Sequence, residues 1–155
     1  MVTKHSKKIS FLILVLSLFG LGIAGYSLAY HNNIVSGSFC TLNATFDCGI
    51  VSRGPYSEIA GIPVALIGIF GYLLLGAGAI LHLRQSEDIG SSAFLVLAST
   101  GGLGFSGYLT GLEAWVIHAW CLLCLVSQAT ILSIFIASLF LLFSDRKVNH
   151  RLNRE

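Results

Sequence analysis

The distribution of charged residues is the feature that most constrains how this chain folds. Four stretches contain no Asp, Glu, Lys or Arg and together hold about three quarters of the 155 residues: 9–46, 59–83, 89–112 and 114–144. A soluble domain of this size cannot bury so much apolar surface, because its surface-to-volume ratio requires a polar exterior. The composition therefore excludes a soluble enzyme and a disordered chain. A net charge of only +2, concentrated near the ends, also excludes a nucleic-acid-binding face.

Each stretch is long enough to cross a bilayer as a helix, which takes about 20 apolar residues. We predict an all-α membrane protein, with residues 1–155 forming a single integral membrane domain. It is a four-transmembrane-helix bundle with a large outer loop between spans one and two. The spans lie near 9–30, 62–83, 91–112 and 118–143. An alternative for span one is a signal peptide cleaved after the small residues Ser27-Leu28-Ala29.

Basic residues indicate the orientation of these spans. Eight of the nine Lys and Arg residues precede span one, separate spans two and three, or follow span four, and only Arg53 lies on the other side. Because Lys and Arg concentrate in cytoplasmic loops, both termini are expected to face the cytoplasm. The loop at about 31–61 then faces outward. We expect an integral protein of the bacterial cytoplasmic (inner) membrane.

Small residues recur four apart within the predicted spans, as in Gly20 with Ala24 and Gly107 with Gly111. Residues at this spacing share a helix face and let neighbouring backbones approach closely in lipid. We therefore predict close helix packing at both pairs.

All four cysteines, Cys40, Cys48, Cys121 and Cys124, fall on the outer side of this topology. Disulfides persist on the oxidising side of a bacterial membrane. An even number of cysteines there suggests two pairs, and the sequence leaves three connectivities open.

The sharpest chemical signal is Cys121-Leu122-Leu123-Cys124 at the start of span four. Residues three apart share a helix face, and the N–H groups of a first turn stabilise a thiolate, the reactive form in disulfide exchange. This pattern favours a redox pair. The alternatives are two buried cysteines acting as small apolar residues, or a zinc site of four thiolates; we expect no metal.

The pair Cys40-x7-Cys48 is less specific, since a structural disulfide is an adequate explanation of it. Ser36-Gly37-Ser38 precedes the pair, so the loop is predicted to be flexible. A mobile dithiol of this kind can exchange with an external protein thiol and then with the pair on span four.

Together these motifs resemble the vitamin K epoxide reductase family of membrane thiol–quinone oxidoreductases. The four-span plan covers nearly the whole chain. The residues that carry the resemblance are Cys40-x7-Cys48, Gly54-Pro55-Tyr56-Ser57, Gly61-Ile62-Pro63-Val64 and Trp120-Cys121-Leu122-Leu123-Cys124. The resemblance implies a four-helix bundle around a quinone of the ubiquinone, menaquinone or vitamin K type, with the outer loop capping it.

The resemblance also assigns catalytic roles to the cysteines. Cys40 and Cys48 become a shuttle that takes electrons from a thioredoxin-like disulfide carrier protein. Cys121 receives them, and Cys124 faces the quinone. No thioredoxin-like domain follows span four, so this partner is expected to be a separate protein.

Two positions depart from the family pattern. Gly54 stands where many relatives have a hydroxyl residue, and Gln128 stands where animal members have Tyr. The Gln128 amide can bind a quinone carbonyl or form an interhelical hydrogen bond.

The leading hypothesis is therefore a membrane oxidoreductase that supports disulfide bond formation. The alternatives are an animal-type vitamin K epoxide or quinone reductase, and a non-catalytic membrane protein with structural disulfides. A transporter is disfavoured because the predicted spans contain no charged residue.

Several further residues carry weaker expectations. We expect His82 to lie at the membrane interface and Glu113 to be a solvated carboxylate of the short outer loop. Seven aromatic residues are candidates to line the quinone pocket, although Trp115 and Trp120 fit an interfacial belt better. They are Phe39, Tyr56, Tyr72, Phe105, Tyr108, Trp115 and Trp120.

Overall fold

Four long helices make up most of the chain in the computed structural model. They are α1 (Val2–His31), α3 (Val64–Arg84), α4 (Ile89–Leu112) and α5 (Leu122–Leu152). Each contains a segment long and apolar enough to cross a membrane. The structure describes residues 2–35, 41–43, 46–49, 54, 57–59, 61–85, 89–118 and 120–152. Within these residues, the prediction of an all-α, four-helix membrane protein is confirmed.

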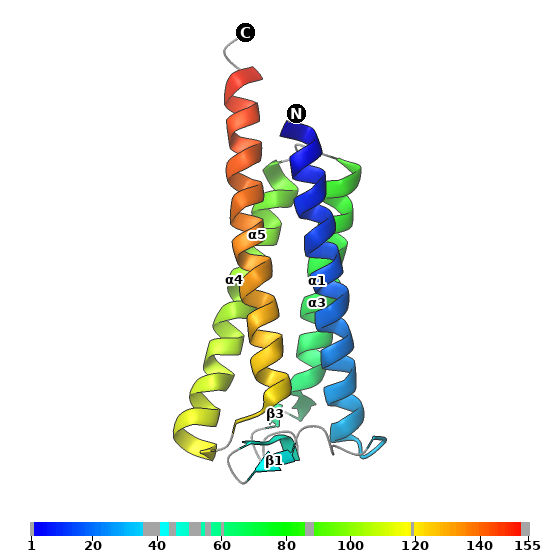
Figure 1. Cartoon of the computed structure of the whole chain (residues 1–155), viewed down its shortest axis with the longest axis vertical. Coiled ribbons are helices and arrows are strands. Elements are labelled where there is room, and N and C mark those ends of the chain that lie inside the picture. The colour runs from blue at the N-terminus through cyan, green and yellow to red at the C-terminus, as the bar shows by residue number, and fades with distance from the viewer. Residues whose placement is uncertain are drawn as a thin grey trace.

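The helices run side by side as an elongated bundle (Figure 1). α1 packs against α3 and α5, and α4 packs against the same two helices. α1 begins and α5 ends at one end of the bundle, and the short strands between α1 and α3 lie at the opposite end (Figure 1). We call these the terminal end and the loop end.

Two short antiparallel hairpins lie within the described part of the loop end. β1 (Thr41–Asn43) pairs with β2 (Phe46–Asp47), and β3 (Glu58–Ile59) pairs with β4 (Ile62–Pro63). Gly61 turns the second hairpin with a φ of +79°, a conformation that glycine adopts without steric cost. Glu58 also pairs with His31 at the end of α1, at 3.4 Å between Oε1 and Nε2. This pair attaches the second hairpin to the bundle.

Small residues allow close packing at one of the two predicted pairs. A Cβ on Gly20 would overlap the ring of Tyr72, and a Cβ on Gly68 would lie 3.5 Å from that of Ala24. α1 and α3 therefore meet closely along Gly20 and Ala24. The prediction for Gly107 and Gly111 is wrong, because a Cβ at either position meets no described atom within 4 Å.

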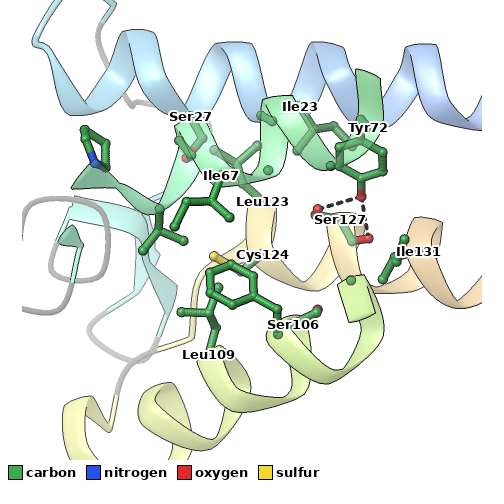
Figure 2. Close-up of a pocket in the computed structure, with 18 of the residues that line it drawn as sticks. Ile23, Ser27, Ile67, Tyr72, Ser106, Leu109, Leu123, Cys124, Ser127 and Ile131 are labelled. Carbon is green, nitrogen blue, oxygen red and sulfur yellow. Dashed lines mark hydrogen bonds between the residues drawn. The ribbon is translucent and has the colours of Figure 1, made fainter. Parts of the chain in front are cut away.

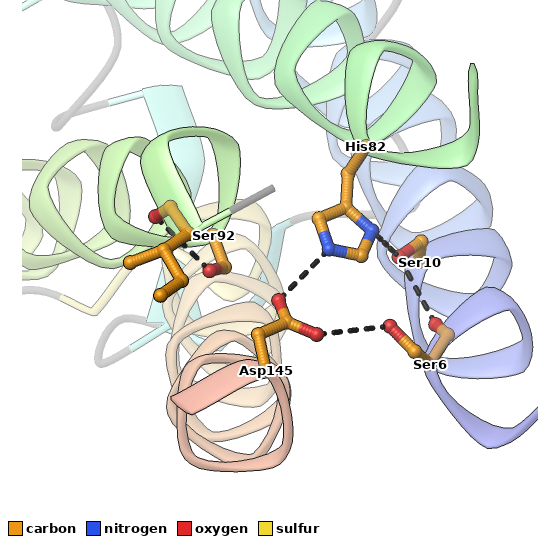
Figure 3. A network of polar contacts seen from close by, with 6 residues as sticks. Ser6, Ser10, His82, Ser92 and Asp145 are labelled. Carbon is orange, nitrogen blue, oxygen red and sulfur yellow. Dashed lines mark hydrogen bonds and ion pairs between the residues drawn. The ribbon is translucent and has the colours of Figure 1, made fainter. Parts of the chain in front are cut away.

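A buried polar network joins α1, α3 and α5 near the terminal end (Figure 3). His82 lies between Ser10 and Asp145, with its Nδ1 2.8 Å from the Ser10 Oγ and its Nε2 2.9 Å from the Asp145 Oδ2. Ser6 donates to the Asp145 Oδ1 at 3.3 Å. All four side chains are buried. His82, expected at the membrane interface because it flanks a span, has its ring turned into the bundle, where it contacts side chains of α1 and α5.

The network predicts how the bundle responds to loss of the histidine. His82→Leu leaves the Asp145 carboxylate buried without its ring partner, so the free energy of unfolding should fall by about 3 kcal/mol. The double variant His82→Leu/Asp145→Leu should recover much of this loss, because no unpaired charge remains. Thermal unfolding in detergent measures both effects. His5→Leu is the control, since His5 is an exposed histidine of α1. Equal stability of the His82 and His5 variants would contradict a structural role for the network.

Candidate functional site

The helical path breaks between α4 and α5, and this break positions the cysteine pair. α4 continues as a π-helical turn, η1 (Glu113–Ile117), and His118 then adopts a left-handed φ of 54°. A left-handed residue cannot continue a right-handed helix. α5 therefore begins at Leu122, and the prediction that span four starts at His118 is corrected.

Cys121 is the residue immediately before α5, and its carbonyl accepts the N–H of Leu125 at 3.0 Å. The Cys124 thiol, hydrogen-bonded to the Cys121 sulfur, lowers the pKa of Cys121, and the backbone N–H groups of Cys124 and Leu123 act in the same direction. These contacts outweigh burial, which raises the pKa. Cys121 thus holds a thiolate at lower pH than an ordinary cysteine.

The loop cysteine Cys48 lies directly against Cys121. Their Sγ atoms are 3.4 Å apart, and both side chains are fully buried in a small cluster with Tyr30. Cys48 is disulfide-bonded, whereas Cys121 and Cys124 are free thiols. A thiolate at this distance from a disulfide sulfur is placed for exchange. Cys40 lies outside the described residues, so its predicted place in the shuttle stays a prediction.

Cys124 faces a cavity of about 450 Å³ that all four long helices line (Figure 2). The cavity is mostly apolar and falls within the range of small-molecule sites. Its apolar walls include Ile23, Ile67, Leu109, Leu123 and Ile131. A free thiol therefore borders an apolar space within the bundle.

A few polar groups border the same cavity. The Tyr72 hydroxyl donates to the Ser127 carbonyl at 3.0 Å and lies 2.8 Å from the Ser127 hydroxyl (Figure 2). Thr110 also lines the cavity, and its hydroxyl bonds to the Oε1 of Gln128. Of the two roles expected for Gln128, the structure shows the interhelical hydrogen bond. Gln128 is not among the described residues that line the cavity. A contact of its amide with a quinone stays a prediction.

The aromatic candidates divide in the structure. Tyr72 and Phe105 line the cavity. Tyr108 and Trp115 are instead exposed on the outside of the bundle, at 58% and 83%. Trp120 is half-buried and is not among the described lining residues. Phe39 and Tyr56 lie outside the described residues.

Glu113 departs most from its sequence-based expectation. Its side chain is 2% exposed, so the prediction of a solvated loop carboxylate is wrong. Its Oε2 accepts the backbone N–H of Cys121 at 3.3 Å, and the residue lines the cavity. Glu113 is the first residue of the π-helical turn that follows α4, and its side chain is buried there. One signal pointed to it: Glu113 is the only acidic residue between positions 89 and 144.

A carboxylate oxygen of Glu113 and the sulfurs of Cys121 and Cys124 lie within 4.8 Å of one another. Carboxylate oxygens and thiolate sulfurs are common metal ligands. However, a neighbour of Cys121 is a disulfide sulfur of Cys48, which is an electrophile rather than a thiolate ligand. The disulfide-bonded Cys48 therefore does not offer the thiolate that a four-thiolate zinc site would require of it. The arrangement favours thiol–disulfide chemistry.

Comparison with known proteins identifies the family. The model of the vitamin K epoxide reductase family matches residues 11–139, which cover most of the chain. The chain therefore belongs to this family, as its motifs indicate. A comparison with curated proteins found no match.

The contact between the two thiols predicts a pH dependence that two substitutions can separate. Cys124→Ser keeps a hydroxyl donor beside Cys121, whereas Cys124→Ala removes it. The Ala variant should show a higher Cys121 pKa than the Ser variant. As the pH is lowered, exchange of Cys121 with the Cys48 disulfide should therefore begin to slow at a higher pH in the Ala variant. Mass spectrometry of acid-quenched samples would follow the Cys48–Cys121 mixed disulfide. Coincident pH profiles would show that the Cys124 side chain does not stabilise the thiolate.

Proposed function

We propose that this membrane redox enzyme of the thiol–quinone type takes electrons from a thioredoxin-like carrier protein and passes them to a quinone. The observation that supports this most directly is the arrangement of three sulfurs. Cys48 touches Cys121 at 3.4 Å, and Cys124, three residues further on, borders the apolar cavity. The sulfurs thus connect the loop with the interior of the bundle. The product is a new disulfide in the carrier protein.

The proposed path consists of balanced disulfide exchanges. The carrier dithiol first reduces the Cys40–Cys48 disulfide and becomes oxidised. The Cys48 thiolate then attacks the Cys121 sulfur of a Cys121–Cys124 disulfide, and Cys124 leaves as a thiolate. Cys40 next attacks Cys48, which restores the loop disulfide and releases Cys121. Each cycle delivers two electrons to the Cys121–Cys124 dithiol.

The cavity suits a quinone head group. Its walls are mostly apolar, and its polar groups are few, among them Thr110, Ser127 and the Tyr72 hydroxyl. A quinone bound there supplies a two-electron acceptor that also takes up two protons. The cavity walls would hold the ring beside Cys124 and exclude water from the thiol.

The orientation follows from charge. Lys7, Lys8, Arg146 and Lys147 are exposed near the terminal end of the bundle, and basic residues favour the cytoplasmic side. The loop end then faces the periplasm of a bacterial cytoplasmic membrane, where a disulfide carrier operates. This places the exchange chemistry on the oxidising side.

Quinone reduction by the purified protein tests the function. With a reduced thioredoxin-like donor, the wild type should reduce ubiquinone-1 or menadione, followed by the loss of quinone absorbance. Cys121→Ser and Cys124→Ser should lower the rate to the uncatalysed background, because the dithiol cannot form. Ser133→Ala, an exposed position of the same helix, is the control. Turnover that survives both cysteine substitutions would contradict the proposal and favour structural disulfides.

Single cysteines at the two ends of the bundle test the orientation. In a cysteine-free background, Ile34→Cys at the loop end and His150→Cys at the terminal end both place a thiol at an exposed position. A membrane-impermeant maleimide should label the first in intact cells and the second only after permeabilisation. The opposite pattern would reverse the orientation.

A further inference from the structure

The carboxyl group of Glu113 has one oxygen without a hydrogen-bond partner. Oε2 accepts the N–H of Cys121, but Oε1 is buried and bonds to no described atom. A buried carboxylate that lacks half of its hydrogen bonds is costly. Such groups are rare in membrane spans and usually mark a function. The position of Glu113 therefore needs an explanation beyond packing.

The surroundings of Glu113 place it among the reacting atoms. One of its carboxylate oxygens lies within 4.8 Å of the sulfurs of both Cys121 and Cys124. The residue also lines the cavity, and it supplies the only carboxyl group among the described lining residues. Glu113 is thus next to the electron donor and beside the space proposed for the acceptor.

The redox step requires proton transfer at this place. When the dithiol is oxidised, its sulfurs form one S–S bond and release two electrons, while both quinone oxygens become hydroxyls. With Cys121 ionised, Cys124 supplies one proton and solvent supplies the other. A direct path for the Cys124 proton requires a base within reach of both the thiol and the cavity, and a carboxylate is a usual base for such transfers.

On the basis of the function proposed above, we propose that Glu113 is a catalytic proton-transfer residue. Its carboxylate takes the proton from the Cys124 thiol as the S–S bond forms and gives it to a quinone oxygen. The two electrons pass from the sulfurs to the quinone, and Glu113 returns to its starting state. The bond from the Cys121 N–H to Oε2 keeps the carboxylate in place, so Oε1 is free to carry the proton.

Two substitutions at this position separate proton transfer from packing. Glu113→Gln keeps the size of the side chain and an oxygen for the Cys121 N–H, but its amide cannot take up a proton. Glu113→Asp keeps the carboxyl group on a shorter side chain. Ser133→Ala is the control, because Ser133 is an exposed residue of α5 that is not among the described lining residues.

The experiment measures quinone reduction over a range of pH, together with trapping of the Cys48–Cys121 mixed disulfide. Glu113→Gln should lower kcat about 100-fold, leave KM and the trapping rate unchanged, and abolish the pH dependence contributed by the carboxyl group. Glu113→Asp should recover a substantial part of kcat, and Ser133→Ala should match the wild type.

Each other outcome overturns a specific claim. A Glu113→Gln enzyme with wild-type kcat and pH profile would refute proton transfer and leave the proposed function standing. A variant that also loses disulfide trapping, with no recovery in Glu113→Asp, would show that Glu113 only positions Cys121. A wild type that reduces no quinone would refute the proposed function itself, and the proton-transfer role with it.

Discussion

In lipid, a helix bundle must supply hydrogen-bond partners for its own buried polar groups. In this structure, the way in which it does so distinguishes the two ends of the bundle. Near the terminal end, both ring nitrogens of His82 and both carboxylate oxygens of Asp145 have partners. At the loop end, Glu113 has an oxygen that bonds to no described atom, beside two free thiols. The first arrangement is saturated and joins three helices. The second keeps a carboxylate oxygen without a hydrogen bond next to free thiols, and groups of this kind can react.

The break in the helical path gives the two cysteines different surroundings. Had α5 started at residue 118, both sulfurs would point from one continuous helix face. Instead, the left-handed His118 places Cys121 before the helix, where its sulfur meets Cys48 and the first N–H groups of α5. Cys124 lies in the first turn and lines the cavity. One Cys-x-x-Cys motif therefore faces two partners.

The spans and the cysteine motif could be predicted because both depend only on residues that are close together in the sequence. Uncharged length indicates a membrane span directly, and the Cys-x-x-Cys spacing is unambiguous. Burial could not be predicted in the same way, because helices that are apolar around their whole circumference give little sign of which side faces inward. His82 looked interfacial, yet it faces the centre of the bundle. Glu113 was expected to be solvated because a π-helical turn cannot be recognised from its sequence. At Gly107 and Gly111, an added Cβ would meet no described atom within 4 Å.

Under the proposed function, the separation of the two sulfur environments also sets the order of electron transfer. Cys48 and Cys121 are fully buried in a cluster with Tyr30, and of the described cysteines only Cys124 lines the cavity. A quinone bound in this cavity would therefore meet Cys124 and would not reach the Cys48 sulfur. In the proposed path, electrons from the loop pass through Cys121, whose lowered pKa favours both its attack on a disulfide and its departure from one. In this proposal the bundle prevents a direct reaction between the loop and the quinone, a reaction that would bypass Glu113 as the proton-transfer residue.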